Sequence, residues 1–161
     1  MSSTYRRIIQ EHAILNKNIE HHKNNNYHDF IYKIITIDNG LVLFKSEIQI
    51  NYKNKNHYID VFYKKNYPFC PPSKILLNGT NIFQIYKKIM TDNKDIITDC
   101  ICCKSLLCSN IWVVMNTIKN IIEEILKIID YKNLYIKRRL LNKITEKYTN
   151  QHLDYLHYYL L

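Results

Sequence analysis

The sequence predicts an α+β fold in which helices cover one antiparallel sheet. Three observations favour this class: a helical pattern opens the chain, several short β-type segments with turn residues between them follow, and helical patterns close it. Consecutive strands with short links pair as an antiparallel meander. The 161 residues suffice for one core, so we expect a single domain over residues 1–161.

The first helix is expected over residues 4–22. Its apolar side chains recur at close to helical spacing, and Arg6, Arg7 and Lys17 take the polar face. Ser2, Ser3 or Thr4 could cap its first turn. A polar run at residues 23–26 ends it.

Four strands are expected next, over residues 30–37, 41–52, 58–63 and 74–77. The first two are joined by Asp-Asn-Gly at 38–40, a strong hairpin signal. The second alternates, with Val42, Phe44, Ser46, Ile48 and Ile50 on one face. All three prolines fall in residues 66–72 and predict an extended, rigid turn after the third strand.

The helical part of the chain is expected after the sheet. Residues 81–97 are ambiguous between a helical turn or two and a loop. Residues 117–131 carry a continuous apolar stripe and predict a helix. Residues 134–161 predict a C-terminal helical extension in one long or two shorter pieces.

The net charge of +9 comes from 23 basic and 14 acidic residues, and it could suit an acidic partner or nucleic acid. The lysines are scattered, however, and no basic block alternates with aromatic residues, so solvated lysine is the better interpretation and no nucleic acid is expected. No apolar run is long enough to span a membrane, and the N-terminus lacks a signal-peptide core. We therefore expect an intracellular protein, cytoplasmic or nuclear, without a membrane partner.

Residues 99–112 are the chemically richest stretch, because they hold four of the five cysteines and the only tryptophan. One thiolate could carry an acyl group. Alternatively, Cys100, Cys102 or Cys103, and Cys108 could hold zinc, although two separated C-x-x-C pairs are absent. Simple packing is the third interpretation. We expect neither a metal nor a cofactor, and the zinc site remains the alternative.

Several motifs in this order resemble the ubiquitin-conjugating enzyme family. Residues 6–11 are similar to its first helix, and residues 58–72, ending Tyr-Pro-Phe-Cys-Pro-Pro, to its third strand and proline turn. Residues 101–107 resemble its active-site segment, and Trp112 follows Cys103 at the usual separation. The resemblance covers nearly the whole chain and implies a ubiquitin-conjugating-enzyme-like fold.

The resemblance also implies an activity. Cys103, or alternatively Cys102, would accept ubiquitin or a ubiquitin-like protein as a thioester and pass it to a lysine amine. The family's histidine-proline-asparagine motif is absent, as is its serine-proline after the tryptophan. Asn93, ten residues before Cys103, is the nearest substitute for the missing asparagine, and Asn81 is a weaker one.

Partner contacts are implied in the same way. Arg6 and Arg7 would meet the activating enzyme of this ATP-dependent pathway, and Phe69 would lie in the loop that contacts ubiquitin ligases, with Trp112 beside it. For the two arginines the alternative is a solvated helix face. For Phe69 it is packing within the turn, and for Trp112 it is an anchor in the core. A catalytically inactive binding scaffold of the same fold is the second functional hypothesis.

Overall fold

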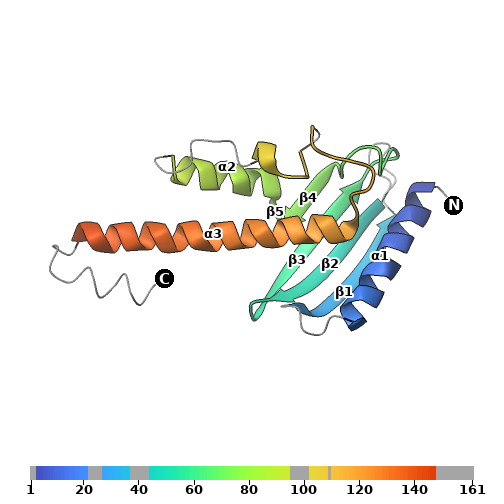
Figure 1. Ribbon diagram of the computed structural model, residues 1–161, viewed down its shortest axis with the longest axis horizontal. Helices are drawn as coiled ribbons and strands as arrows, with labels where there is room; N and C mark the ends of the chain where they lie inside the picture. The colour runs from blue at the N-terminus through green and yellow to red at the C-terminus, as the bar shows by residue number, and fades with distance from the viewer. Residues whose placement is uncertain (1–2, 22–26, 37–43, 95–101, 109, 148–161) are drawn as a thin grey trace. The chain divides into compact units, whose positions relative to one another are not determined.

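The computed structural model describes residues 3–21, 27–36, 44–94, 102–108 and 110–147. It is an α+β structure with an antiparallel sheet and helices at both ends, which confirms the predicted fold class (Figure 1). The expected Asp-Asn-Gly turn and residues 148–161 lie outside the described residues.

The sheet has five strands in the order β1-β2-β3-β4-β5, and each pairs antiparallel with the next. The predicted meander therefore lacked one strand. The missing strand is β5, which contains only two residues and pairs with the end of β4. The strands are β1 Tyr27–Thr36, β2 Phe44–Tyr52, β3 Lys55–Tyr63, β4 Lys74–Leu77 and β5 Thr80–Asn81.

Strand β2 alternates as predicted, because successive side chains of a strand point to opposite faces. Phe44, Ser46, Ile48, Ile50 and Tyr52 are buried, and the residues between them are partly exposed. The buried face continues into β3 and β4 through Ile59, Val61, Ile75 and Leu77. One face of the sheet is thus core, and it is the face on which a helix must pack.

Helix α1, Ser3–His21, packs on this buried face. Its buried residues Ile8, Glu11, His12 and Leu15 recur at the spacing of one helical face. The His12 Nε2 atom lies 2.9 Å from Ser46 Oγ on β2, and the His12 ring stacks on Tyr32 at a centroid distance of 4.3 Å. These contacts fix α1 against β1 and β2.

The ambiguous stretch after β4 contains a helix, α2, Ile82–Asp92. Asn81 caps it, since its side-chain Oδ1 accepts a hydrogen bond from the Phe83 N–H at 2.9 Å. Ile82, Ile85, Tyr86 and Ile89 are buried. A short 3₁₀ helix, η1, Cys102–Lys104, contacts α2.

The helix predicted over residues 117–131 and the described part of the extension predicted over residues 134–161 form one helix, α3, Ile118–Lys147. Residues 131–134 do not interrupt it, because they contain no glycine or proline. The chain divides into two compact units, Met1–Leu126 and Lys127–Leu161. In the first, α3 buries Ile118, Ile121 and Ile125; in the second, the Tyr131 and Tyr135 rings lie 6.5 Å apart. Within the described residues, no helix is both long and apolar enough to cross a membrane.

Candidate functional site

Cys103 lies in η1 and is exposed to solvent, as is the neighbouring Lys104. The next residues form a tight turn, in which Ser105 Oγ accepts from the Leu107 N–H at 3.2 Å and the Ser105 carbonyl accepts from the Cys108 N–H at 3.0 Å. Ser105 and Leu107 are buried. The turn therefore anchors the segment behind Cys103 and leaves the Cys103 side chain at the surface.

Asn93 lies at the end of α2, where its buried side-chain amide donates to the Ile89 carbonyl at 2.8 Å. This amide closes the helix. Figure 1 draws η1 beside the first part of α2 and the opposite end of α2 away from it. The 11 residues of α2 span about 16 Å, so Asn93 and Asn81 mark two well-separated ends. It is Asn81 that caps the end nearer to η1.

Trp112 is an anchor between two loops. It is 9% exposed, and its indole N–H donates to the Pro68 carbonyl at 2.7 Å. Its ring lies 6.0 Å from that of Tyr67, which in turn packs edge-on against Tyr63 at 4.7 Å. The segment after the cysteines is thereby held against the proline turn at residues 66–72. Of the two interpretations from sequence, the core anchor describes this burial.

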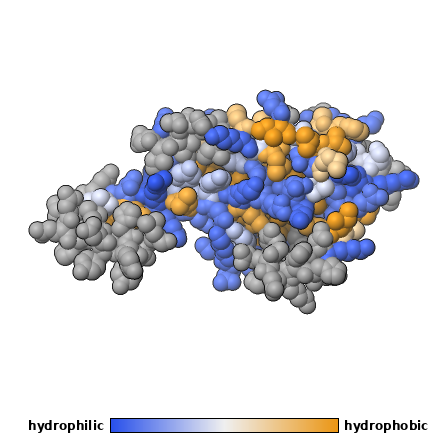
Figure 2. Space-filling view, viewed as in Figure 1, coloured by the Kyte–Doolittle hydropathy of each residue, from blue (hydrophilic) through white to orange (hydrophobic). Residues whose placement is uncertain are grey.

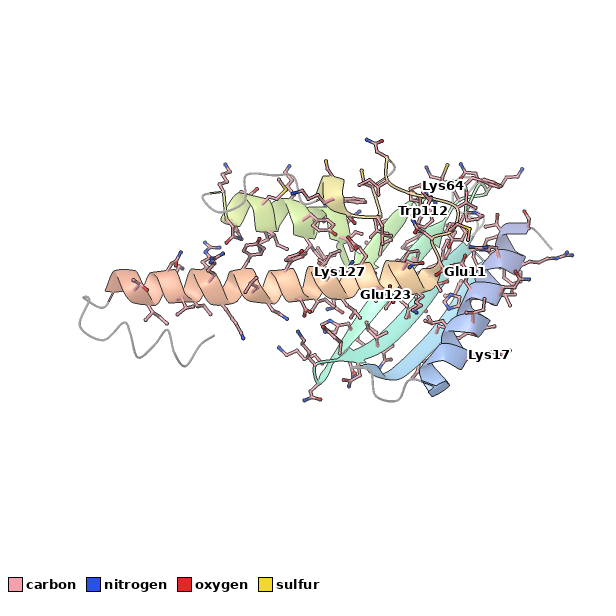
Figure 3. The ribbon with its side chains drawn as sticks, in the orientation of Figure 1. Glu11, Lys17, Lys64, Trp112, Glu123 and Lys127 are labelled. Atoms are coloured by element: carbon pink, nitrogen blue, oxygen red, sulfur yellow. The ribbon has the colours of Figure 1, made fainter. Side chains whose placement is uncertain are left out.

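A buried carboxylate joins three segments of the chain. Glu11 is 5% exposed and accepts hydrogen bonds from the Tyr67 hydroxyl at 2.7 Å, from the Ile118 N–H at 2.9 Å and from Arg7 Nε. Burial and then the charge of Glu11 raise the pKa of Tyr67, which keeps the hydroxyl protonated as a donor. Figure 3 shows Glu11 where α1 meets the start of α3, close to Trp112.

An apolar surface lies on the two joined loops. We name it the loop surface; its exposed side chains are Phe69, Ile111, Val113, Val114 and Met115. Phe69 is 76% and Met115 81% exposed, which is unusual for side chains of this size. Figure 2 shows hydrophobic residues gathered where Figure 1 draws the segment between η1 and α3. Contiguous exposed apolar side chains are typical of protein-binding surfaces.

The two arginines named from sequence differ. Arg6 is exposed on α1. Arg7 is half-buried, pairs with Glu11 and donates through Nη2 to the Val114 carbonyl at 3.4 Å. Arg7 thus connects α1 to the loop surface, while Arg6 remains available on the helix face.

Among the described side chains, no three His, Cys, Asp or Glu residues form a group that could hold a metal ion. The zinc alternative takes Cys100, Cys102 or Cys103, and Cys108 as ligands, and of these Cys100 and the Cys102 side chain lie outside the described residues. A match was sought among protein-family models, curated proteins and solved structures, and none was found.

Sequence reasoning missed Glu11 and Tyr67, whose hydrogen bond joins α1 to the proline turn. A signal was present: Glu11 falls on the buried stripe of α1 between Ile8 and Leu15, where a charged residue needs partners. The partners come from segments 56 and 107 residues away, so the pattern along α1 could not name them.

Proposed function

We propose that this protein is a divergent ubiquitin-conjugating enzyme with that family's fold and Cys103 as its nucleophile. The single observation that carries the proposal is the exposed Cys103 thiol in η1, between a helix that contacts η1 and an anchored Trp112 segment. The order of helix, meander, proline turn and tryptophan anchor supports the same fold. An acyl-carrying cysteine must reach two large protein partners in turn, and exposure allows this.

The reaction is a pair of acyl transfers. The Cys103 thiolate attacks the thioester carbonyl by which an activating enzyme holds ubiquitin or a ubiquitin-like protein; a new C–S bond forms and the donor thiolate leaves. A lysine amine then attacks the new thioester. The C–N bond forms, the C–S bond breaks, the Cys103 thiolate leaves, and the amine proton passes to solvent. No metal or cofactor takes part.

Partners follow from the surfaces. Arg6 and Arg7 would meet the activating enzyme, and the loop surface around Phe69 would meet a ubiquitin ligase. Exposed apolar side chains beside buried aromatic anchors are more typical of a protein-binding surface than of a loop that faces only solvent. Trp112 would act through its hold on Pro68 and not by direct contact.

The test is charging. Purified protein is incubated with an activating enzyme, ATP and each of several ubiquitin-like proteins, and a conjugate that thiols reverse is expected. Cys103→Ala should abolish it, while Cys70→Ala and Cys108→Ala should keep it. If Cys102→Ala abolishes the conjugate and Cys103→Ala does not, the neighbouring cysteine is the nucleophile. If no conjugate forms with any modifier, the enzymatic assignment is wrong.

An inactive binding scaffold is the second candidate. The observation in its favour is that the Asn93 amide is engaged with the Ile89 carbonyl at the end of α2 away from η1, so it supplies no donor beside Cys103. A scaffold would bind partners through the loop surface yet fail to charge. The charging assay, run beside a binding assay with ubiquitin-ligase domains, separates the two.

A further inference from the structure

The loop surface has no regular secondary structure of its own, and yet its two halves are held by side-chain bonds. Trp112 bonds to Pro68, and Thr4 Oγ1 donates to the carbonyls of Lys65 and Tyr67 at 2.8 and 3.2 Å. The remaining bonds converge on Glu11. Its bond to the Tyr67 hydroxyl holds the turn that carries Phe69. Its bonds to the Ile118 N–H and to Arg7, which in turn donates to the Val114 carbonyl, hold the chain on both sides of Met115.

We propose that Glu11 is the positioning residue that holds the two halves of the loop surface in the arrangement a protein partner binds. That the loop surface contacts a ubiquitin ligase rests on the proposed function, whereas the positioning by Glu11 does not. Glu11 does not touch the partner. It acts through Tyr67, Ile118 and Arg7, and each of these groups lies on a different segment.

The need for a carboxylate follows from the donors. The Glu11 Oε2 atom accepts from both the Tyr67 hydroxyl and the Ile118 N–H, and Oε1 accepts from Arg7 Nε. A glutamine has only one acceptor oxygen, and its NH₂ group would face a donor. The two bonds to the buried oxygen would be retained, and the half-exposed Arg7 would turn away and release the Val114 carbonyl.

Core stability alone does not explain this residue. Burying a charged group costs more than burying an apolar one of the same size, and apolar replacements of buried ion pairs are often neutral or stabilising. What the carboxylate adds is direction, because three donors from distant parts of the chain must meet at its two oxygens. The N-terminus of α3 adds a favourable interaction with its negative charge.

The test uses Glu11→Gln and nuclear magnetic resonance of the whole chain. Trp112 is the only tryptophan, so its indole N–H gives one resonance that reports on the bond to Pro68. Amide exchange is followed at Trp112 and Asn116 in the loop segment and at Ile59 and Val61 in β3. Leu15→Ala, buried on the same helix, is the control for general destabilisation.

We expect Glu11→Gln to raise exchange at Asn116 by about tenfold or more while β3 amides change less than about twofold, as local opening requires. Leu15→Ala should raise exchange in β3 and in the loop segment together. In the wild-type background, Arg7→Ala should raise amide exchange at Asn116 as Glu11→Gln does. In the Glu11→Gln background it should cause no further rise, because both substitutions remove the interaction between Arg7 and Glu11.

Two results would overturn the inference: wild-type exchange at Asn116 in Glu11→Gln, or a rise that β3 shares in equal measure. Should Glu11→Gln fail to fold, Tyr67→Phe and Arg7→Ala test the same network, and additive effects of these two on Asn116 would contradict it. Failure of wild-type protein to charge on Cys103 would instead remove the proposed function and leave the positioning result intact.

Discussion

The Trp112 indole N–H donates to the Pro68 carbonyl at 2.7 Å, across 44 residues of sequence. This bond joins the segment after the exposed Cys103 to the proline turn that carries Phe69. The two features that the sequence singled out independently, the cysteine segment and the proline turn, are therefore one structural unit. Its rigidity depends on a few side chains, and each can be removed singly.

Replacing Trp112 by Phe should destabilise the protein by about 1–2 kcal/mol, because the hydrogen bond and part of the packing against Tyr67 are lost. Chemical denaturation measures this difference. The matched control is Tyr58→Phe, which removes a polar atom from an exposed aromatic side chain of β3 and should change stability by less than about 0.5 kcal/mol. Equal effects of the two substitutions would show that the Pro68 bond contributes nothing.

Acid should destabilise the fold through His12. Burial lowers the pKa of His12 from 6.5 to about 4, so the folded state keeps the ring neutral while the unfolded state protonates it. The unfolded state then binds more protons between pH 6.5 and about 4, and stability falls as pH falls through this window. At about 1.4 kcal/mol per pKa unit, the loss is about 3 kcal/mol.

Denaturation curves at pH 7, 6, 5 and 4 measure this loss. His12→Gln, which can still bond to Ser46 but does not titrate, should have lower stability at pH 7 and a flatter profile over the window. An unchanged slope in His12→Gln would assign the acid sensitivity to other groups.

Periodic features of the fold were predictable, and features made by few residues were not. The β2 alternation from Phe44 to Tyr52 follows from a local side-chain period and occurs as expected, and on α1 the apolar residues Ile8 and Leu15 are buried at helical spacing. Strand β5 has two residues, too few for any period, and α2 was uncertain because its polar end resembles a loop. No glycine or proline lies near residue 132, and this absence is the feature of the sequence that indicates a continuous α3.

The burial of single candidate residues could be anticipated from the sequence better than the distances between them. Cys103 is exposed, as a nucleophile requires, and Trp112 is buried, as an anchor requires. Sequence distance ranked Asn93 above Asn81 as the donor near Cys103. Chain separation does not measure distance in space, however, because Asn93 and Asn81 lie at opposite ends of α2 and the Asn81 end is the one nearer to η1. Glu11 was hidden for the same reason.

The loop surface should bind a partner without supporting the fold. Phe69→Ala should leave stability within about 0.5 kcal/mol of wild type, because the side chain is 76% exposed. Binding to ubiquitin-ligase domains, measured by titration calorimetry, should weaken by about tenfold or more, as for a central apolar contact. The control is Ile31→Ala, which removes an apolar side chain of similar exposure from β1. Equal weakening by both variants would argue against a specific surface.

Substitutions of the two asparagines that flank α2 should distinguish a role in stability from a role in thioester discharge. Asn93→Ala removes the bond to the Ile89 carbonyl and leaves a buried acceptor, so it should cost about 1–2 kcal/mol in stability. Asn81→Ala removes the N-cap of α2 and should cost about 1 kcal/mol. Discharge of the thioester to free lysine distinguishes them further. Asn81→Ser keeps the cap and loses the amide, so slow discharge with normal stability in this variant would identify Asn81 as the donor. Slow discharge in Asn93→Ala, together with normal discharge in Asn81→Ser, would instead identify Asn93 as the donor.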